Sequence, residues 1–329
     1  MRLMGITRKD EKKMTTGPIS RELLMTLPHK LHGSWQRCAE SYRLDSHGVG
    51  VEDILCSAEL RQARERMGTI MKVADPELDR LHGIVSTLDY TVLLADREGV
   101  VVARRGDPPF EKGCRRWNLW PGARWSEEEA GTNGLGTCLT EQAPVTVHMD
   151  QHWRLGLRYL TCSAVPFYGP DGKIAGALDV SSTRPDPTGR VASMMEAVLI
   201  DAARRMERRS FLEVFRNRTV VMLGESSNIS LPMVALDEAR VIVGATFAAR
   251  NMLNLPEDSA GEVCFDLDAG TTGTPDFREA ERAVIEGALA MSQGKIAPAA
   301  RLLGISRSTM HRKIRAMNAE RARHGNADI

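Results

Sequence analysis

The sequence lacks several features that would place it outside the cytoplasm or among nucleotide-dependent enzymes. It has no apolar run long enough to span a membrane, and no apolar core followed by a small-residue cleavage site near its amino terminus. Its six cysteines form no CxxC pair, and the phosphate-loop pattern GxxxxGK[ST] does not occur. We therefore expect a cytoplasmic protein whose cysteines are free thiols, most of them buried.

The composition is that of a soluble globular protein of two or three domains. Hydrophobic residues make up 42% and charged residues 26% of 329 residues, and the formal net charge is +1. A near-neutral chain is not a nucleic-acid binder over its whole length. No spacing of Ser, His and Asp, or of paired carboxylates, indicates a catalytic constellation. The sequence thus predicts neither enzymatic activity nor a cofactor.

Positive charge gathers at the carboxyl-terminal end, in a stretch that predicts three helices. Residues 280–318 contain an amphipathic segment, an alanine-rich segment and a basic segment, and the last two are separated by the turn 303–306. Between Lys295 and Arg323 the basic residues are opposed only by Glu320. This pattern is typical of a helix-turn-helix, in which the second helix of the pair enters the DNA major groove.

The basic helix, residues 307–318, has two predicted faces. Met310, Ile314 and Met317 recur at helical spacing and should face a core. The predicted base contacts come from Arg307, Ser308, Thr309 and His311, and the predicted phosphate contacts from Arg312, Lys313 and Arg315, with Arg301 and Lys295 completing the DNA-binding set. The alternative is a solvated basic helix, but the small pair Ala299–Ala300 and the glycine at 304 favour the motif.

The middle of the chain changes from helical to strand periodicity at Asp89. Residues 90–95 and 100–103 predict a hairpin across the turn 96–99, and residues 160–168 and 174–182 predict a second hairpin. A strand at 144–148 and a helix at 194–215 complete an α+β domain with an antiparallel sheet flanked by helices.

Helices precede this domain and a smaller unit follows it. A helical stripe at 31–42, with Ser34 as its cap, comes first. A longer helical stretch at 52–87 should break at Pro76 into two helices. After the domain, strands are predicted at 219–223, 231–236 and 241–243, a helix at 245–253, and a Gly/Thr/Asp-rich linker at 258–275.

A candidate pocket for a small effector lies in the middle domain. Residues 131–137 read GTNGLGT and predict a tight turn with positive φ at Gly134 or Gly136, whose backbone amides could line a pocket. The predicted effector-binding residues are Trp117, Trp120, Trp125, Thr132, Asn133, Gly134, Leu135, Cys162 and Asp179. Ordinary core packing of the tryptophans, and pairing of Asp179 with a neighbouring loop, remain open alternatives.

A metal site is not predicted. Cys114, Cys138 and Cys162 are evenly spaced, and His148 and His152 are four residues apart. However, Cys162 falls in a buried strand, and His148 ends a strand, where two histidines four apart do not share a helical face.

Several motifs resemble known families. The stretches ER at 281–282, AARLLGISR at 299–307 and RK at 312–313 resemble the Fis-type helix-turn-helix. The stretches WSE at 125–127, GTNGLGT at 131–137, LTCSAVP at 160–166 and GALDVS at 176–181 resemble the GAF sensor of AcoR-like bacterial regulators, and SWQRC at 34–38 resembles their amino-terminal arm. Residues 232–255 are similar to the first half of a PAS domain.

This resemblance implies a division of the chain and a function. The expected parts are a disordered start at 1–18, a helical arm at 19–74, a GAF-like sensor at 75–215, a PAS-like segment and linker at 216–273, and the helix-turn-helix at 274–329. AcoR-like activators normally carry an AAA+ ATPase between sensor and helix-turn-helix. Here residues 216–273 leave no room for it, so control without ATP hydrolysis is expected.

The implied protein is a regulator of transcription that responds to a small molecule. Its expected partners are operator DNA, a small-molecule effector, a second copy of the chain and RNA polymerase, with no membrane and no metal. Homodimers are expected because two-fold operators require two copies of a helix-turn-helix. The alternative is an adaptor that acts by pairing with a full-length, ATPase-containing regulator.

Overall fold

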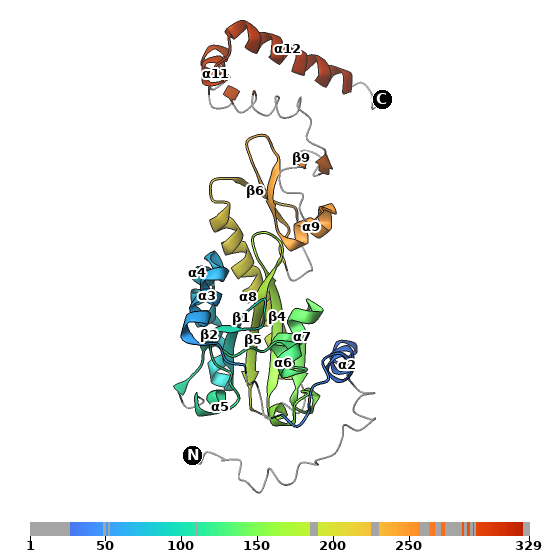
Figure 1. The fold of residues 1–329 in the computed structure, drawn as a ribbon. Coiled ribbons are helices and arrows are strands. Elements are labelled where there is room, and N and C mark those ends of the chain that lie inside the picture. The colour runs from blue at the N-terminus through green and yellow to red at the C-terminus, as the bar shows by residue number, and fades with distance from the viewer. Residues whose placement is uncertain are drawn as a thin grey trace.

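The computed structural model describes residues 27–48, 51, 53–108, 111–184, 190–224, 230–256, 263–266, 271–273, 285, 288, 289, 292 and 294–324. The described parts follow one long axis, with a five-stranded sheet toward one end and the helices α11 and α12 at the other (Figure 1). The predicted start at 1–18 lies outside the described residues. Within them, no helix combines the length and apolar character needed to cross a membrane.

A five-stranded antiparallel sheet forms the larger domain, in the order β2-β1-β5-β4-β3. Its strands are β1 Thr91–Asp96, β2 Val101–Arg105, β3 Val145–His148, β4 Thr161–Tyr168 and β5 Ile174–Ser182. Both predicted hairpins are confirmed. In the first, Gly99 takes a φ of +79° and Asp96 Oδ1 accepts the backbone N–H groups of Glu98 and Val100, which closes the turn.

Long helices cover one face of this sheet: α3 Ser57–Met67, α4 Thr69–Val85 and α8 Arg190–Val214. Their apolar residues pack against the side chains of β1 and β5 that point to this face, among them Val92, Leu178 and Val180. The predicted break at Pro76 is wrong, because Pro76 lies inside α4 and the chain breaks at Gly68, whose φ is +52°. A positive φ ends a helix more decisively than one missing N–H does.

Short helices cover the other face. They are α2 His29–Gln36 with a π-helical turn Arg37–Ser41, α5 Glu111–Arg116, α6 Glu127–Ala130 and α7 Gly134–Glu141. Short 3-10 turns lie elsewhere, at Ser86–Leu88 between α4 and β1, and at Met149–Gln151 and Leu155–Leu157 between β3 and β4. Ser34 does not cap the first helix as predicted. It lies within α2, is fully buried and bonds across to Glu127, so tertiary contact, not helix capping, uses its hydroxyl.

A smaller unit follows α8, with strands in the order β6-β7-β8. Its elements are β6 Thr219–Met222, β7 Met233–Leu236, β8 Ile242–Ala245 and α9 Phe247–Leu253, followed by β9 Cys264–Asp266 and β10 Thr271–Gly273. The predicted linker at 258–275 is therefore partly wrong. Ile242 N–H donates to Val263 O, and Cys264 forms an isolated antiparallel β-bridge with Val241. The chain after α9 therefore returns to the edge of β8.

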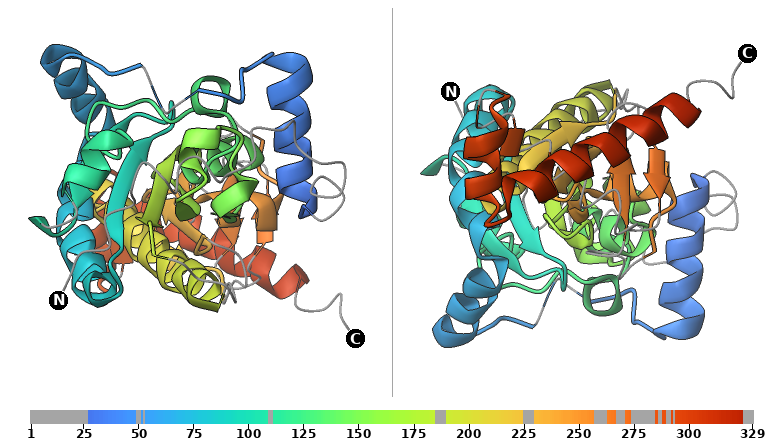
Figure 2. Two further views of the ribbon diagram at one scale, coloured as in Figure 1. Left: turned by 90° about the horizontal axis from the view of Figure 1, so that it is seen from below. Right: turned by 90° about the horizontal axis from the view of Figure 1, so that it is seen from above.

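Helix α8 joins the two units, because its end packs on the smaller sheet. Phe211 and Phe215 form one cluster with Met233 and Ala235. On the sensor side, Arg205 of α8 forms an ion pair of 2.8 Å with the buried Glu77 of α4. The end-on views show α8 running alongside the sheets (Figure 2).

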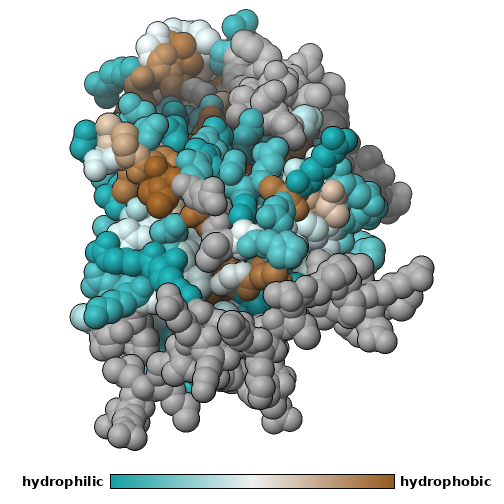
Figure 3. All heavy atoms as spheres, turned by 60° about the horizontal axis from the view of Figure 1, so that its bottom comes forward, coloured by the Kyte–Doolittle hydropathy of each residue, from teal (hydrophilic) through white to brown (hydrophobic). Residues whose placement is uncertain are grey.

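The carboxyl-terminal helices are α11 Ile296–Leu302 and α12 Arg307–His324. Ile285, Ala288, Ala299, Ala300 and Met310 share one small core. The predicted fold class is thus confirmed: an antiparallel sheet with flanking helices, followed by an all-helical end. In the view of Figure 3, hydrophilic side chains cover most of the described surface, and apolar patches are separate from one another.

Candidate effector site and DNA-binding surface

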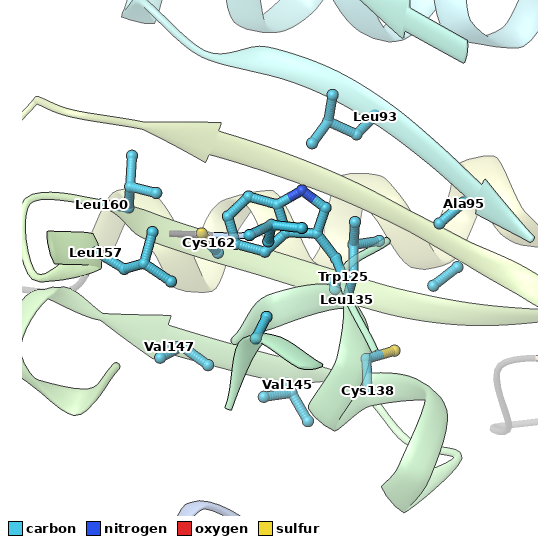
Figure 4. Packing of buried hydrophobic residues seen from close by; sticks show 14 of the residues in the cluster. Leu93, Ala95, Trp125, Leu135, Cys138, Val145, Val147, Leu157, Leu160 and Cys162 are labelled. Carbon is cyan, nitrogen blue, oxygen red and sulfur yellow. The ribbon is translucent and has the colours of Figure 1, made fainter. Parts of the chain in front are cut away.

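Trp125 fills the middle of the core between the sheet and α7. It is 2% exposed, and the residues around it include Leu93 of β1, Leu135 and Cys138 of α7, Leu157 and Leu160 (Figure 4). Its Nε1 donates to Asn118 O over 3.0 Å. The structure therefore places this predicted effector residue as a packed core side chain with its one polar atom satisfied.

Gly134 and Gly136 are required by close packing, not by backbone conformation. Both lie in α7, and the positive φ that was predicted for one of them belongs to Gly131, at +72°. A Cβ on Gly136 would lie 2.4 Å from Glu127 N and from Trp125 O. The segment GTNGLGT is thus a helix start pressed against its neighbours, not a loop with free amides.

The polar residues of this segment hold it in place. Asn133 Oδ1 accepts the N–H of Gly136 over 2.8 Å, and Asn133 Nδ2 donates to Gly131 O and Trp125 O. Thr132 Oγ1 lies 2.8 Å from Ser34 Oγ. Both side chains are fully buried, so their polar atoms are committed to the protein itself.

Beneath the first turn of α7 lies a buried polar chain of Cys162, Ser181 and Asp179. Ser181 Oγ is 2.5 Å from Asp179 Oδ1 and 3.1 Å from Cys162 Sγ. A Cβ on Gly134 would lie 2.7 Å from Asp179 Oδ2, which shows how closely the helix start approaches this carboxyl. Asp179 Oδ2 has no hydrogen-bond partner in the described part of the chain.

Burial has the largest effect on the pKa values of Asp179 and Cys162, two of these three residues. It raises the pKa of Asp179 to about 7, against the opposing hydrogen bond from Ser181. Burial, and secondarily the charge of Asp179, raises the pKa of the Cys162 thiol well above its usual value. The thiol is therefore protonated and can donate to Ser181 Oγ, which leaves the Ser181 hydroxyl to donate to Asp179.

A small pocket of about 190 Å³ opens beside this core. Its walls come from the start of β1, the end of β5 and α5, and include Tyr90, Cys114, Trp117, Leu119, Leu160 and Ser181. Trp117 donates from Nε1 to Gly156 O over 3.1 Å. Trp120 is covered instead by the guanidinium of Arg115, 3.7 Å from the ring centroid. Of the predicted effector residues, Trp117 lines this pocket directly.

A larger hollow of about 670 Å³ lies between the sensor and the smaller unit. Its walls include Arg66, Asp96, Lys173, Ser210 and Arg250. None of the predicted effector residues lines it. Sequence periodicity did not indicate this hollow, because it exists only where two units meet.

The amino-terminal arm is bound to the sensor by a charged network that sequence reasoning missed. Arg37 Nε lies 2.6 Å from Glu127 Oε1, and Arg37 Nη2 lies 2.7 Å from Glu141 Oε1. Ser34 Oγ donates to the second oxygen of Glu127 over 2.6 Å. The arm thus packs on α6 and α7. The predicted boundary between residues 74 and 75 falls inside α4.

The turn between α11 and α12 has the geometry of a tight helix connection. Gly304 takes a φ of +63°, and Ile305 N–H donates to Ala300 O over 3.0 Å. Ser306 Oγ accepts the N–H of Thr309 over 3.1 Å and so caps α12. The Thr309 and Ser308 hydroxyls lie within 2.9 Å of Ser306 Oγ, so both join this cap.

The two predicted faces of α12 separate as expected in its described part. Met310 is fully buried and Ile314 packs on the same core, whereas Arg307, Ser308, Arg312 and Arg315 are exposed. Lys295 and Arg301 are exposed as well, while Thr309, His311 and Lys313 are half-buried. The side chain of Met317, and residues Val284 and Met291 of the preceding segment, lie outside the described residues.

Comparison with known proteins agrees with this architecture. Residues 69–208 match the GAF domain, and residues 277–317 match the family described as bacterial regulatory protein, Fis family. The acetoin catabolism regulatory protein of Cupriavidus necator is 34% identical over 228 residues, which cover 68% of this chain and 34% of that protein. This chain therefore carries a GAF domain and a Fis-type helix-turn-helix, and it is similar to AcoR-type regulators.

Two further comparisons bear on extent and fold. The acetoin dehydrogenase operon transcriptional activator AcoR of Bacillus subtilis is 26% identical over 230 residues, which cover 69% of this AcoR-like chain and 37% of that protein. The chain thus spans about a third of the length of both relatives. A chain in the solved Escherichia coli DhaR(N)–DhaL complex shares the fold, with a TM-score of 0.51 at 15% identity over 74% of this chain and 84% of that one.

Residues 209–276 separate the two matched domains of this AcoR-like chain. They form the smaller sheet unit where they are described, and both Gly-Lys pairs of the chain, at 172–173 and 294–295, are followed by isoleucine and not by Ser or Thr. Within this chain the GAF domain and the helix-turn-helix are therefore joined without an AAA+ ATPase.

Proposed function

We propose that this chain is a DNA-binding transcriptional regulator whose sensor domain responds to a small molecule without ATP hydrolysis. The observation that carries the proposal is the division of α12. Met310 is fully buried in the core that it shares with Ala299 and Ala300 of α11, whereas Arg307 at the start of α12, and Arg312 and Arg315 farther along it, are exposed to solvent. Basic side chains on the free face of the second helix are what major-groove docking and phosphate contact require.

The proposed effector site is the sensor interior around the pocket beside Trp117. Ser181 lines that pocket and bonds to Asp179, whose second oxygen is unpaired in the described residues. A small ligand that entered there would meet Ser181 against a largely apolar wall, with the Asp179 carboxyl one hydrogen bond behind it, which suits a small, weakly polar molecule. The names of two relatives make acetoin the first compound to test.

The proposed route to the DNA end runs along α8. This helix is bound to α4 by the ion pair of Arg205 with Glu77, and its last turns pack on the smaller sheet. A ligand that binds one arrangement of this helix more tightly than another shifts the population of that arrangement. In a homodimer, such a shift changes the distance between two recognition helices, and so effector and DNA affinities are linked.

The test is binding of the purified chain to fragments of its own genome, measured with and without acetoin. Selection should enrich a two-fold symmetric site, and light scattering should give the mass of a dimer. A chain that ends at residue 273 should lose the selected site. If the shortened chain bound that site as well as the full chain does, the assignment of DNA binding to α12 would be wrong.

The second candidate function is an adaptor that pairs with an ATPase-containing relative. It rests on the relatives' greater length and on the absence of an ATPase between the matched domains. In that case the purified chain alone would not shift DNA, and its helix-turn-helix would serve in association. Addition of the full-length relative would then be needed for any DNA complex.

A further inference from the structure

Buried polar atoms without partners occur close together in sequence, in the connection between β3 and β4 and at the first residue of β4. In the described part of the chain, Arg158 Nε and Nη2, His152 Nε2 and Thr161 Oγ1 are shielded from solvent and form no hydrogen bond. Buried polar atoms are nearly always paired, and an unpaired one costs free energy. Several in one short connection indicate that this part of the protein is arranged for a bound polar group.

Arg158 presents the edge of its guanidinium that binds two oxygens at once. Nε and Nη2 point the same way and form two parallel N–H bonds with a carboxylate or a phosphate. No carboxylate within the described residues forms an ion pair with Arg158, and Asp150 acts on it only at a distance. Burial lowers the pKa of Arg158, since the cation has lost water without gaining a counterion.

His152 is close enough to Arg158 for the charge of Arg158 to act on its ring. Its Nδ1 lies 3.0 Å from Met149 O, and because a carbonyl can only accept, Nδ1 carries the proton and Nε2 is an acceptor. Burial is the main reason that the pKa of His152 is lowered to about 4; the hydrogen bond to Met149 O opposes the shift, and the positive charges of His148 and Arg158 contribute to it. A neutral His152 can therefore accept an O–H from a ligand whose oxyanion lies on Arg158.

Thr161, the first residue of β4, lies near the start of α8. Ser163 Oγ reaches Ala192 O in the first turn of α8, and Tyr168 N–H donates to Glu207 near its end. Strand β4 and helix α8 thus run in the same direction, and Thr161 lies at the level where α8 begins. The amino-terminal end of a helix favours negative charge.

We propose that Arg158, with His152 on the same connection and Thr161 at the start of β4, binds the oxyanion of a small phosphate or carboxylate ligand. The site differs from the pocket beside Trp117 and shares none of the residues that the sequence predicted for the effector. The proposal does not depend on the proposed binding of DNA by α12. Phosphate and carboxylate groups both offer Arg158 a pair of negatively charged oxygens. A phosphate group that also carries an O–H can donate that hydrogen to His152.

The test titrates inorganic phosphate, and separately acetate, into the full chain in an anion-poor buffer. The readout is the ¹⁵N-edited signal of the His152 ring, assigned with the variant His152→Gln, together with the melting temperature. Phosphate should shift the ring signal saturably and raise the melting temperature. Acetate with the same effect would make the site a general carboxylate and phosphate site, and phosphate alone would make it a phosphate site.

Variants distinguish anion binding at Arg158 from anion binding at other basic side chains. Arg158→Gln should abolish the shift, and Arg158→Lys should weaken binding at least tenfold, because an ammonium cannot form two parallel bonds. Arg61→Gln removes an exposed arginine of α3 and should leave binding intact. Phosphate held by α12 leaves the His152 ring unmoved. If neither anion moves the wild-type signal, or if Arg158→Gln responds like wild type, the proposal is overturned; if Arg158→Gln unfolds, Arg158→Lys decides.

Discussion

Tyr168 of the sensor stacks on Phe247 of the smaller unit, with ring centroids 4.0 Å apart and ring planes 4° apart. Beside this stack, Arg250 Nε donates to Asp171 O in the turn between β4 and β5. The two rings come from different units, so the stack connects the end of β4 to α9.

Replacing Phe247 with Ala should loosen the smaller unit without unfolding the sensor. An offset aromatic pair is worth about 1 kcal/mol beyond its buried area, so amide hydrogen exchange in β6 to β8 should accelerate about five-fold. Met252→Ala on the same helix is the control, because Met252 is 55% exposed. Equal exchange in both variants would mean that the stack does not couple the units.

Gly136→Ala should destabilise the sensor strongly. The new Cβ would lie 2.4 Å from two backbone atoms, Glu127 N and Trp125 O, which cannot move aside as a flexible side chain can. We expect a loss of about 3 kcal/mol in the free energy of unfolding, measured with denaturant. Gly83→Ala is the matched control: Gly83 lies in α4 with open space around its Cβ position, so it should gain up to about 1 kcal/mol.

Asp179 should make the sensor less stable as the pH rises toward neutrality. Its pKa of about 7 in the folded chain exceeds the ordinary 3.8, so between these values the folded state binds more protons than the unfolded state. The stability contributed by protonated Asp179 is full below about pH 4 and is lost as the pH rises through 7.

The variant Asp179→Asn isolates this effect. From pH 5 to pH 8 the wild type should lose about 2–3 kcal/mol more than the variant does, from about 1.4 kcal/mol per pKa unit. Burial raises the pKa of Glu207 to about 8. Glu207 therefore adds the same pH dependence of stability to both proteins, and its effect cancels in the comparison. Parallel stability curves for the two proteins would show that Asp179 is ionised in the folded chain.

Arg307 and Lys313 should affect DNA binding in different ways. Arg307→Ala should cost about 1–3 kcal/mol at the selected site and little on unrelated DNA, because a lost base contact removes discrimination. Lys313→Ala should weaken binding to the selected site and to unrelated DNA about equally. It should also reduce, by about one unit, the slope of log affinity against log salt concentration. Fluorescence anisotropy at several salt concentrations measures both, and identical losses would contradict this division.

Elements with a strong local pattern were predictable from the sequence. The hairpins flanking Gly99 and the turn 169–172, the long helix α8 and the helix pair around Gly304 all follow from hydrophobic periodicity and turn residues. Local signals failed where tertiary contact decided the outcome. Pro76 looked like a helix break, yet packing of Leu78 and Leu81 on the sheet keeps α4 continuous.

Local sequence signals were also insufficient to predict how the residues of the candidate site are arranged. Of the residues predicted to bind an effector, the structure brings Gly134, Cys162 and Asp179 together. It also shows Trp125 and Asn133 committed to packing and to backbone bonds. Arg158 and His152 carried no signal for a shared site, because tertiary packing decides which polar atoms of the β3–β4 connection are buried without partners.

By itself the sequence determined the order of the domains, the antiparallel hairpins and the two faces of α12. These depend on residues close together in the chain, where side-chain periodicity and turn chemistry act directly. Only the tertiary structure decided which glycines are pressed against backbone, how the arm is bound through Arg37 and Glu127, and which buried polar atoms lack partners. Those properties belong to pairs of atoms far apart in sequence, which the chain pattern cannot place.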